Sequence, residues 1–330
     1  MFTRARKLEI LEEAWPIAGK FAISRGSKTM AEVVVACITQ ANLTGRGECV
    51  PYARNHETVE SVVNLIKSVR RKIELGCSSE ELQSLIPAGA ARNALDCALI
   101  DLEAKRSGVP ARVLFGLPEP RPSITAYTIS LDAPQAMAAA AKLRRHYPLL
   151  KLKLGGVGDD ARIAAVRASA PEADLIVDAN ESWSEQMLAP LTAACLAANV
   201  KLIEQPLPEG RDEALRSFAS PVPFCADESC RDRNSLAHLK GKYQFINVKL
   251  DKAGGITEAV ALARAGKAEG FGIMLGCMVA TSLAMAPIAM LAPLADFIDL
   301  DGPLLLAKDR PHGLLYDGAL MQQAETALWG

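Results

Sequence analysis

The sequence predicts an α/β fold in which a parallel (β/α) barrel follows a separate α+β unit. From residue 122 onward, eight short β-rich runs recur, and most gaps between them hold an alanine-rich helical stretch. This alternation is typical of a parallel barrel. A charged residue also ends nearly every run, which is where the functional groups of such barrels lie.

The first 121 residues place extended segments before helices. Residues 31–50 are expected to form two extended runs around a polar turn that contains Asn42 and Gly45. Periodic apolar residues predict helices over 57–75 and 88–107, the second of them closed by Gly108. Strands followed by helices in about 110 residues indicate an independent α+β unit.

The eight predicted barrel strands follow one another at intervals of roughly 25 residues, and they share little sequence identity. They begin at residues 124, 149, 174, 200, 223, 245, 271 and 296. A doubly wound sheet is the alternative arrangement of the same elements. The polar residues at the strand ends favour the barrel.

These polar residues form a series along consecutive strands. They are Lys151 and Lys153 on the second strand, Asp178 on the third, Glu204 on the fourth, Asp227 on the fifth, Lys249 on the sixth, and Asp299 and Asp301 on the eighth. Alone, a K-x-K pair is more often a solvated strand edge, and a single acidic residue at a strand end is usually a helix N-cap. Three carboxylates on three consecutive strands, flanked by lysines on both sides, indicate one shared site.

The residue types predict the chemistry of that site. Asp178, Glu204 and Asp227 form an all-oxygen ligand set, which suits Mg²⁺ or Mn²⁺ better than zinc. A metal held there can bind a substrate carboxylate and stabilise the charge that develops when the adjacent carbon loses a proton. Lys153 and Lys249 would be the bases on opposite sides of that carbon, and the positive charge of Lys151 and the metal would lower the pKa of Lys153.

The motifs that carry these residues resemble the enolase superfamily, in its muconate-lactonizing-enzyme-like subgroup. They are AGAARNALDCALIDLEAKRSG at 88–108, KLKLG at 151, LIVDANESW at 175, LIEQPLP at 202, ADES at 226 and NVKLDKAGG at 247. The resemblance implies a modified (β/α)7β TIM-like barrel over residues 122–304 and an N-terminal α+β capping domain over 1–121, completed by residues 305–330. It also implies that Asp178, Glu204 and Asp227 bind the metal, that Lys153 and Lys249 are the acid/base pair, and that Lys151 contacts the substrate carboxylate.

The segment IDLDGP at 298–303 resembles the dipeptide epimerases of this superfamily. The segments EEAWPIAGKFAISRGSK at 12–28 and GRGECVPYARNHE at 45–57 resemble in particular the L-Ala-D/L-Glu epimerases of enteric bacteria. By that resemblance Asp299 and Asp301 hold the α-ammonium of the dipeptide, and Arg25 binds the glutamyl side-chain carboxylate. Thr128, Cys277 and Val279 match substrate-lining positions, and Trp15, Tyr52 and Met278 are further pocket candidates. The expected reaction is epimerisation of L-Ala-D-Glu to L-Ala-L-Glu, a step in the recycling of cell-wall peptides.

Three alternatives stay open: a cycloisomerase, an o-succinylbenzoate synthase, and a non-catalytic barrel kept for binding. The first two have substrates without an ammonium group, so the paired aspartates Asp299 and Asp301 count against them. The third predicts the loss of a base or a metal ligand, and all five are present.

Composition limits the partners of the protein. The 37 basic residues nearly balance the 38 acidic ones, which argues against nucleic acid or an anionic membrane as the main partner. The N-terminus lacks the apolar core of a signal peptide, and the most apolar stretch, 273–294, is broken by polar residues and prolines. Eight scattered cysteines without a C-x-x-C pair are expected to be reduced thiols of a cytoplasmic protein. The sequence leaves the oligomeric state open, a homo-oligomer included.

Overall fold

The computed structural model describes residues 6–119 and 121–330. Its strands form three sheets: an antiparallel sheet of three strands, a parallel sheet of eight and a small sheet of three. This is the α/β class that the sequence predicts, with the antiparallel strands first along the chain.

The antiparallel sheet is formed by β1 (Lys7–Ile23), β2 (Gly26–Gln40) and β3 (Leu43–Cys49). The extended runs predicted over residues 31–50 correspond to most of β2 and to β3. Strand β1 and the start of β2 are absent from the prediction, because β1 buries only Leu8 and Ile17 and therefore lacks an alternating apolar pattern. The two long strands make a hairpin whose register shifts between Pro16 and Phe21.

Four helices pack beside this sheet: α1 (Val59–Ser68), α2 (Arg70–Glu74), α3 (Ser79–Leu85) and α4 (Ala90–Ser107). The helix predicted over 57–75 is therefore broken after Ser68, whereas α4 and its closing Gly108 agree with the prediction. Helix α4 lies directly on β3. A Cβ atom added at Gly45 or Gly47 would come within 2.1 or 2.2 Å of an α4 backbone carbonyl oxygen, so this close approach requires glycine.

The eight predicted barrel strands are all present and run parallel, in the spatial order in which they occur along the chain. They are β5 (Tyr127–Ile129), β6 (Leu149–Lys153), β7 (Asp174–Asp178), β8 (Val200–Glu204), β9 (Phe224–Ala226), β10 (Phe245–Val248), β11 (Gly272–Leu275) and β12 (Phe297–Ile298). Ala126 N donates a hydrogen bond of 2.8 Å to Ile298 O, which joins the first strand region to the last. A curled sheet linked in this way agrees with a barrel and not with a doubly wound sheet.

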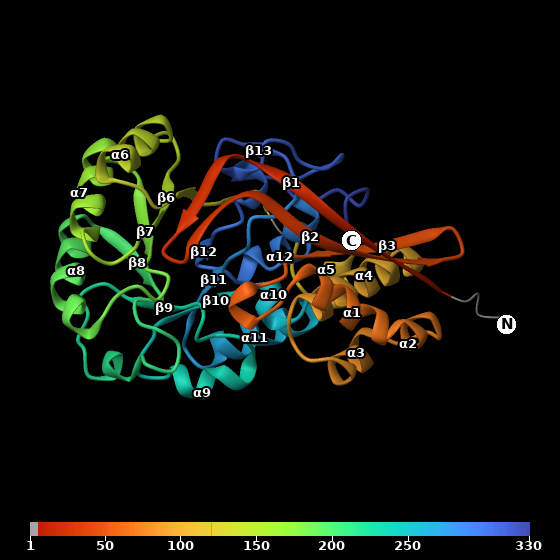
Figure 1. Ribbon diagram of the computed structural model, residues 1–330. Coiled ribbons are helices and arrows are strands. Elements are labelled where there is room, and N and C mark those ends of the chain that lie inside the picture. The colour runs from red at the N-terminus through yellow and green to blue at the C-terminus, as the bar shows by residue number, and fades with distance from the viewer. Residues whose placement is uncertain (1–5, 120) are drawn as a thin grey trace.

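Helices follow most of these strands, and Figure 1 shows α6, α7 and α8 outside the sheet. The helices are α6 (Pro134–Leu143), α7 (Asp159–Ser169), α8 (Glu185–Ala197), α9 (Leu236–Leu239), α10 (Leu250–Ala253), α11 (Ile256–Ala268) and α12 (Ser282–Ala289). Strand β8 is followed only by the short 3₁₀ helix η2 (Glu213–Arg216). In the part of the chain that the structure describes, no α-helix follows β12, as the (β/α)7β description requires.

Strand alternation places the polar residues of the barrel on its inner face. Six apolar residues form an inner layer: Ala126, Leu149, Ile176, Leu202, Cys225 and Met274. Because side chains two residues apart on a strand share a face, the next inner positions toward the strand ends are polar. On β6 to β8 these are Lys151, Asp178 and Glu204, all fully buried. The apolar layer thus forms the floor of the site.

The hairpin of β1 and β2 extends from the antiparallel sheet toward the barrel (Figure 1). Its end is attached to the segment after β5, where Leu131 N donates to Ala22 O at 3.0 Å. Farther along β1, Ala307 N donates to Pro16 O at 2.8 Å. These backbone bonds hold the turn of the hairpin, Ser24–Arg25, over the strand ends.

Buried acidic residues also connect the first unit to the barrel. Glu48 of β3 is fully buried and accepts hydrogen bonds from Thr281 N at 2.8 Å and from Arg310 Nη2 at 2.7 Å. Asp251 of α10 accepts from Val50 N at 3.0 Å. Because a buried carboxylate is costly unless it is hydrogen-bonded, these contacts fix the position of the sheet relative to the barrel mouth.

The C-terminal segment returns to the first unit. Strand β13 (Tyr316–Asp317) pairs with β14 (Leu320–Met321), and β14 pairs with β4 (Ser123–Ile124), which follows the short helix α5 (Ala111–Leu114). Arg46 Nη2 donates to Leu328 O at 2.7 Å, and Gly330 N donates to Asp101 Oδ1 at 2.8 Å. The domain limits 1–121, 122–304 and 305–330 stay a prediction. The contacts of Leu328 and Gly330 agree with the assignment of the C-terminal segment to the first unit.

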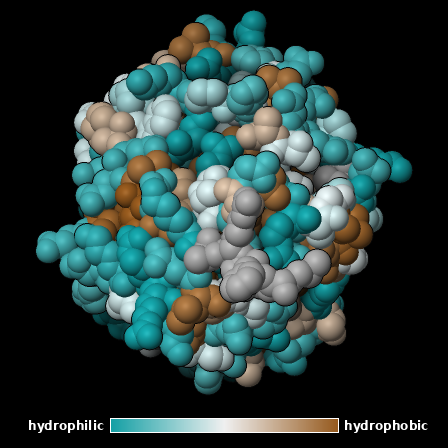
Figure 2. Space-filling model, turned by 90° about the vertical axis from the view of Figure 1, so that its right-hand side faces the viewer, coloured by the Kyte–Doolittle hydropathy of each residue, from teal (hydrophilic) through white to brown (hydrophobic). Residues whose placement is uncertain are grey.

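The apolar stretch 273–294 forms β11 and α12, which are buried as expected. In the described residues, no helix is both long and apolar enough to span a membrane. Figure 2 shows one face of the molecule, on which hydrophobic residues lie in small separate areas within a hydrophilic surface. All eight cysteines are free thiols, as the sequence analysis expects.

Candidate active site

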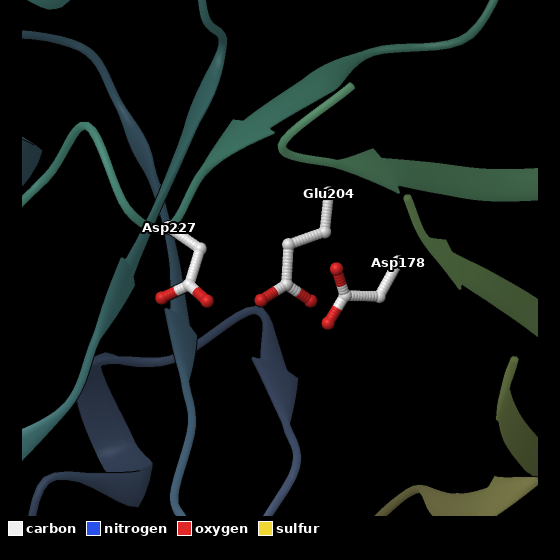
Figure 3. A group of neighbouring side chains, drawn as sticks. All are labelled: Asp178, Glu204 and Asp227. Carbon is white, nitrogen blue, oxygen red and sulfur yellow. The ribbon is translucent and has the colours of Figure 1, made fainter. Parts of the chain in front are cut away.

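Three carboxylates converge at the ends of β7, β8 and β9. One oxygen each of Asp178, Glu204 and Asp227 lies within 4.8 Å of the others, and all three side chains are buried (Figure 3). Among the described residues this is the only acidic, His or Cys cluster close enough to share a metal ion. Mg²⁺ takes oxygen ligands at about 2.0–2.1 Å in an octahedron. Small side-chain shifts would bring three such oxygens to one ion, so the donor set fits the predicted metal.

Three predicted lysines surround this cluster. Lys153 Nζ lies 2.6 Å from Asp178 Oδ2, and Lys249 Nζ lies 2.7 Å from Asp227 Oδ2. Their partners are the two outer members of the triad, so the two amines lie on its two sides. Lys151 is fully buried below them, with Nζ 2.6 Å from Glu204 Oε2.

Burial and charge act in opposite directions on these groups. Burial disfavours the charged form of Lys249, but attraction by Asp227 and Glu204 outweighs it and raises the lysine pKa. Burial would raise the pKa of Asp227, yet Lys249 and Lys252 hold it well below its usual range. The sequence analysis expects neutral amines as bases. The carboxylates that keep Lys249 protonated are also predicted metal ligands, so the same side chains affect both metal binding and the protonation of the base.

Two members of the charge network are missing from the sequence analysis. Lys252 Nζ lies 2.6 Å from Asp227 Oδ1 and donates to Asn247 O at 3.0 Å. Asn247 Nδ2 donates to Glu204 Oε1 at 2.7 Å. Strand alternation could have identified Asn247, which shares a face with Lys249 two residues later. No comparable signal exists for Lys252, because the short helix α10 turns its side chain back toward β9.

The two aspartates after β12 lie next to each other but have different partners. Asp299 Oδ2 accepts a hydrogen bond from Lys151 Nζ at 2.7 Å, and Asp301 Oδ2 accepts from Thr128 N at 2.6 Å. Asp299 Oδ1 is buried without a hydrogen-bond partner among the described residues. Burial and the nearby Asp299 raise the pKa of Asp301 to about 7. The pair is therefore an incompletely satisfied anionic site.

A cavity of about 80 Å³ lies between these groups and the hairpin. Most of the predicted site residues line it, namely Arg25, Thr128, Lys153, Asp227, Lys249, Cys277, Val279, Asp299 and Asp301, together with Tyr52 and Met278. Lys151 is not among the lining residues, and neither are Asp178 and Glu204, the two carboxylates of the triad that lie close to it. Trp15 is also outside the cavity and packs instead against Arg310, 5.0 Å from its ring centre.

Arg25 projects from the hairpin turn to the rim of this cavity. Its Nη2 donates to Glu228 Oε1 at 2.7 Å, and its Nη1 donates to Asn180 O at 3.0 Å. Glu228 directly follows Asp227, and Asn180 lies two residues after Asp178. Asn180 and the next residue, Glu181, both have positive φ angles, 45° and 65°, and this backbone directs the Asn180 carbonyl toward Arg25.

The sequence analysis does not name Glu228 or Glu181, although both touch Arg25. Burial and the charge of Asp227 raise the pKa of Glu228 to about 7. Glu181 accepts two hydrogen bonds from Arg54, at 2.6 and 2.7 Å, which lower its pKa despite burial. Glu181 belongs to the motif ANES and Glu228 to the motif ADES, but only the fold brings these two residues to Arg25.

Two family profiles match the chain. Residues 5–116 match the mandelate racemase/muconate lactonizing enzyme N-terminal domain, and residues 135–307 match the enolase C-terminal domain-like family. The chain is 46% identical to the L-Ala-D/L-Glu epimerase of Escherichia coli K12 over 306 residues, which cover 92% of this chain and 95% of that protein. It is also 46% identical to an N-acetyl-D-glutamate racemase of Pseudoalteromonas over 304 residues, which cover 90% and 95%.

Solved structures agree with these matches. An enolase family member of Agrobacterium tumefaciens with homology to dipeptide epimerases, solved with sodium and L-Ala-L-Glu, has a TM-score of 0.96 and 47% identity and covers 98% of this chain and 100% of its own. A dipeptide epimerase of Enterococcus faecalis, solved with Mg and L-Leu-L-Tyr, has a TM-score of 0.90 and 27% identity and covers 98% of each chain. The chain therefore belongs to the mandelate racemase/muconate lactonizing enzyme family of the enolase superfamily.

Proposed function

We propose that this protein is a Mg²⁺-dependent dipeptide epimerase that interconverts L-Ala-D-Glu and L-Ala-L-Glu. The observation that carries the proposal is the placement of Lys153 and Lys249 on the two sides of a buried carboxylate triad. Inverting one carbon by proton transfer requires a group that removes the proton on one face and a second group that supplies a proton on the other.

Asp178, Glu204 and Asp227 would hold the metal, either Mg²⁺ or Mn²⁺. When bound, the ion supplies positive charge that stabilises the negative charge developing on the substrate carboxylate. Lys151 lies 2.6 Å from Glu204 and 3.6 Å from Asp178, so it adds fixed positive charge under the same position. Lys252 has a comparable place beside Asp227.

The proton transfer belongs to the two cavity-lining lysines. One of them, as a neutral amine, takes the proton from the α-carbon of the second residue. The other, as an ammonium, donates a proton to the opposite face. The roles of Lys153 and Lys249 exchange when the reaction runs in reverse. Each lysine therefore acts as the base for one epimer and as the acid for the other.

The ends of the dipeptide are recognised by charge. Asp299 and Asp301 would bind the α-ammonium, because Asp299 Oδ1 is a buried acceptor without a partner and Asp301 lacks a close cation among the described side chains. Arg25 would bind the side-chain carboxylate of the second residue. Thr128, Cys277 and Val279 line the space between these two ends.

A second candidate is racemisation of an N-acylated glutamate, the reaction named for the Pseudoalteromonas relative. That substrate has the same carboxylates but no ammonium, so the paired aspartates favour the dipeptide. They also count against a cycloisomerase or an o-succinylbenzoate synthase. A non-catalytic barrel would have no need for two lysines beside a complete metal site.

The deciding experiment measures deuterium uptake. The protein is incubated with Mg²⁺ and L-Ala-L-Glu in heavy water, and mass spectrometry and chiral chromatography follow the label and the epimer formed. We expect one deuterium at the α-carbon of the second residue and the appearance of L-Ala-D-Glu. N-acetyl-L-glutamate and L-Ala-L-Gln are run in parallel. Faster conversion of N-acetyl-L-glutamate would favour the second candidate, and no exchange with any of the three would overturn both.

Recycling of cell-wall peptides in the cytoplasm is the setting we propose for this reaction. The support is the chemistry of the substrate, because a peptide bond to D-glutamate is a feature of bacterial cell-wall peptides. Whether the protein works as a homo-oligomer is a separate question that the proposal does not depend on.

A further inference from the structure

Arg25, the residue proposed to bind the substrate side chain, already has a carboxylate partner inside the protein. Its Nη2 lies 2.7 Å from Glu228 Oε1, and the Glu228 side chain is only 1% exposed. Glu228 Oε2 is buried without a hydrogen-bond partner among the described residues. In the described part of the chain, Arg25 is the only cation within ion-pair distance of Glu228.

The second carboxylate near Arg25 is different. Glu181 Oε2 lies 3.2 Å from Arg25 Nη1, but Glu181 also receives two hydrogen bonds from Arg54 and one from Glu209 N at 2.8 Å. Glu181 therefore has a cation partner besides Arg25, namely Arg54, which also pairs with Glu209 at 3.1 Å. Glu228, in contrast, has Arg25 as its one ion-pair partner among the described residues.

From this difference we propose that Glu228 competes with the side-chain carboxylate of the substrate for Arg25 and so limits the preference for an acidic second residue. The inference rests on the proposed function. Two carboxylates that share one guanidinium in a buried site repel each other and leave one negative charge unbalanced. An acidic side chain therefore binds less tightly than Arg25 alone would allow, while a neutral side chain is not subject to this repulsion.

The geometry supports competition rather than simple orientation of Arg25. Arg25 lines the cavity with the lysines and also a neighbouring, more apolar cavity of about 460 Å³. Asn180 O accepts hydrogen bonds from Arg25 Nη1 and from the hydroxyl of the neighbouring Ser24, both at 3.0 Å, and these contacts already hold Arg25 in place. Glu228 is thus not needed to position the guanidinium, and its main effect on the Arg25 site is its negative charge.

Glu228→Gln tests the proposal, because the amide keeps the shape and removes the charge. The two substrates are L-Ala-L-Glu and its neutral isostere L-Ala-L-Gln, which differ only at the side-chain end. We expect the KM ratio between them to shift about tenfold in favour of L-Ala-L-Glu, the low end of what one charge-assisted contact contributes, with kcat changed much less. An effect on the neighbouring metal ligand Asp227 would act on both substrates and cancel in this ratio.

Glu181→Gln is the matched control. Because Arg54 balances Glu181, we expect a clearly smaller shift of the same ratio. If Glu228→Gln turns over neither substrate, calorimetric dissociation constants of both dipeptides at saturating Mg²⁺ give the ratio instead.

An unchanged ratio, a shift toward L-Ala-L-Gln, or an equal shift in Glu181→Gln would each overturn the role of Glu228. Those results leave the wild-type reaction intact. Failure of the proposed function has a different signature, since the wild-type protein would then convert neither dipeptide.

Discussion

Asp301→Asn should separate the dipeptide from substrates without an ammonium group. Asp299 is paired with Lys151 at 2.7 Å, so part of its charge is already balanced. Asp301 accepts a backbone hydrogen bond from Thr128 N at 2.6 Å and has no ion-pair partner among the described residues. An asparagine oxygen can still accept that bond, so the substitution removes the charge and keeps the local structure.

The size of the effect follows from the contact that is lost. A hydrogen bond to a charged group contributes about 1.5–3 kcal/mol, which corresponds to roughly 10- to 150-fold in kcat/KM for L-Ala-L-Glu. N-acetyl-L-glutamate cannot make this contact, so any conversion of it should change by less than about threefold. Asp299→Asn is a poorer probe, because it also removes a partner of the buried Lys151.

Steady-state epimerisation of both substrates, measured by polarimetry at saturating Mg²⁺, provides the test. Equal losses for the two substrates would refute the assignment of the ammonium site to Asp301. The pH profile gives an independent check. Since the pKa of Asp301 is about 7, its carboxylate becomes ionised as the pH rises. We expect kcat/KM for the dipeptide to increase about tenfold between pH 6 and 8, and Asp301→Asn to flatten that increase.

Three further predictions concern the metal, the bases and the side-chain site. Chelation should abolish turnover and Mg²⁺ should restore it; full activity in metal-stripped protein would contradict the role of the carboxylate triad. Lys153→Ala and Lys249→Ala should each stop epimerisation, yet exchange the α-proton of opposite epimers in heavy water, because one base remains on one face. The same epimer preference in both variants would indicate a single base. Arg25→Met should lower kcat/KM for L-Ala-L-Glu by roughly 10- to 100-fold and affect L-Ala-L-Leu much less. Equal losses would mean that Arg25 supports the hairpin and not specificity.

The sequence by itself determined the barrel and the identity of its central charged residues. Eight strand-like runs at a regular interval define the order of the strands, and parallel strands bring their ends to one rim. Asp178, Glu204 and Asp227 each occupy the end of such a strand, so their convergence follows from local pattern alone. Lys151 and Lys153 share the inner face for the same reason, since side chains on a strand alternate.

Tertiary structure alone decided how these charges are shared. Arg25 meets Glu228 across 203 positions of the chain, through a hairpin whose first strand has no readable apolar pattern. Lys252 reaches Asp227 because α10 turns the chain immediately after β10. Lys151 is fully buried against Glu204 and Asp299 and does not line the cavity. Periodicity fixes the face on which a strand residue lies, but the partner of a charged side chain depends on loops that approach from distant parts of the chain.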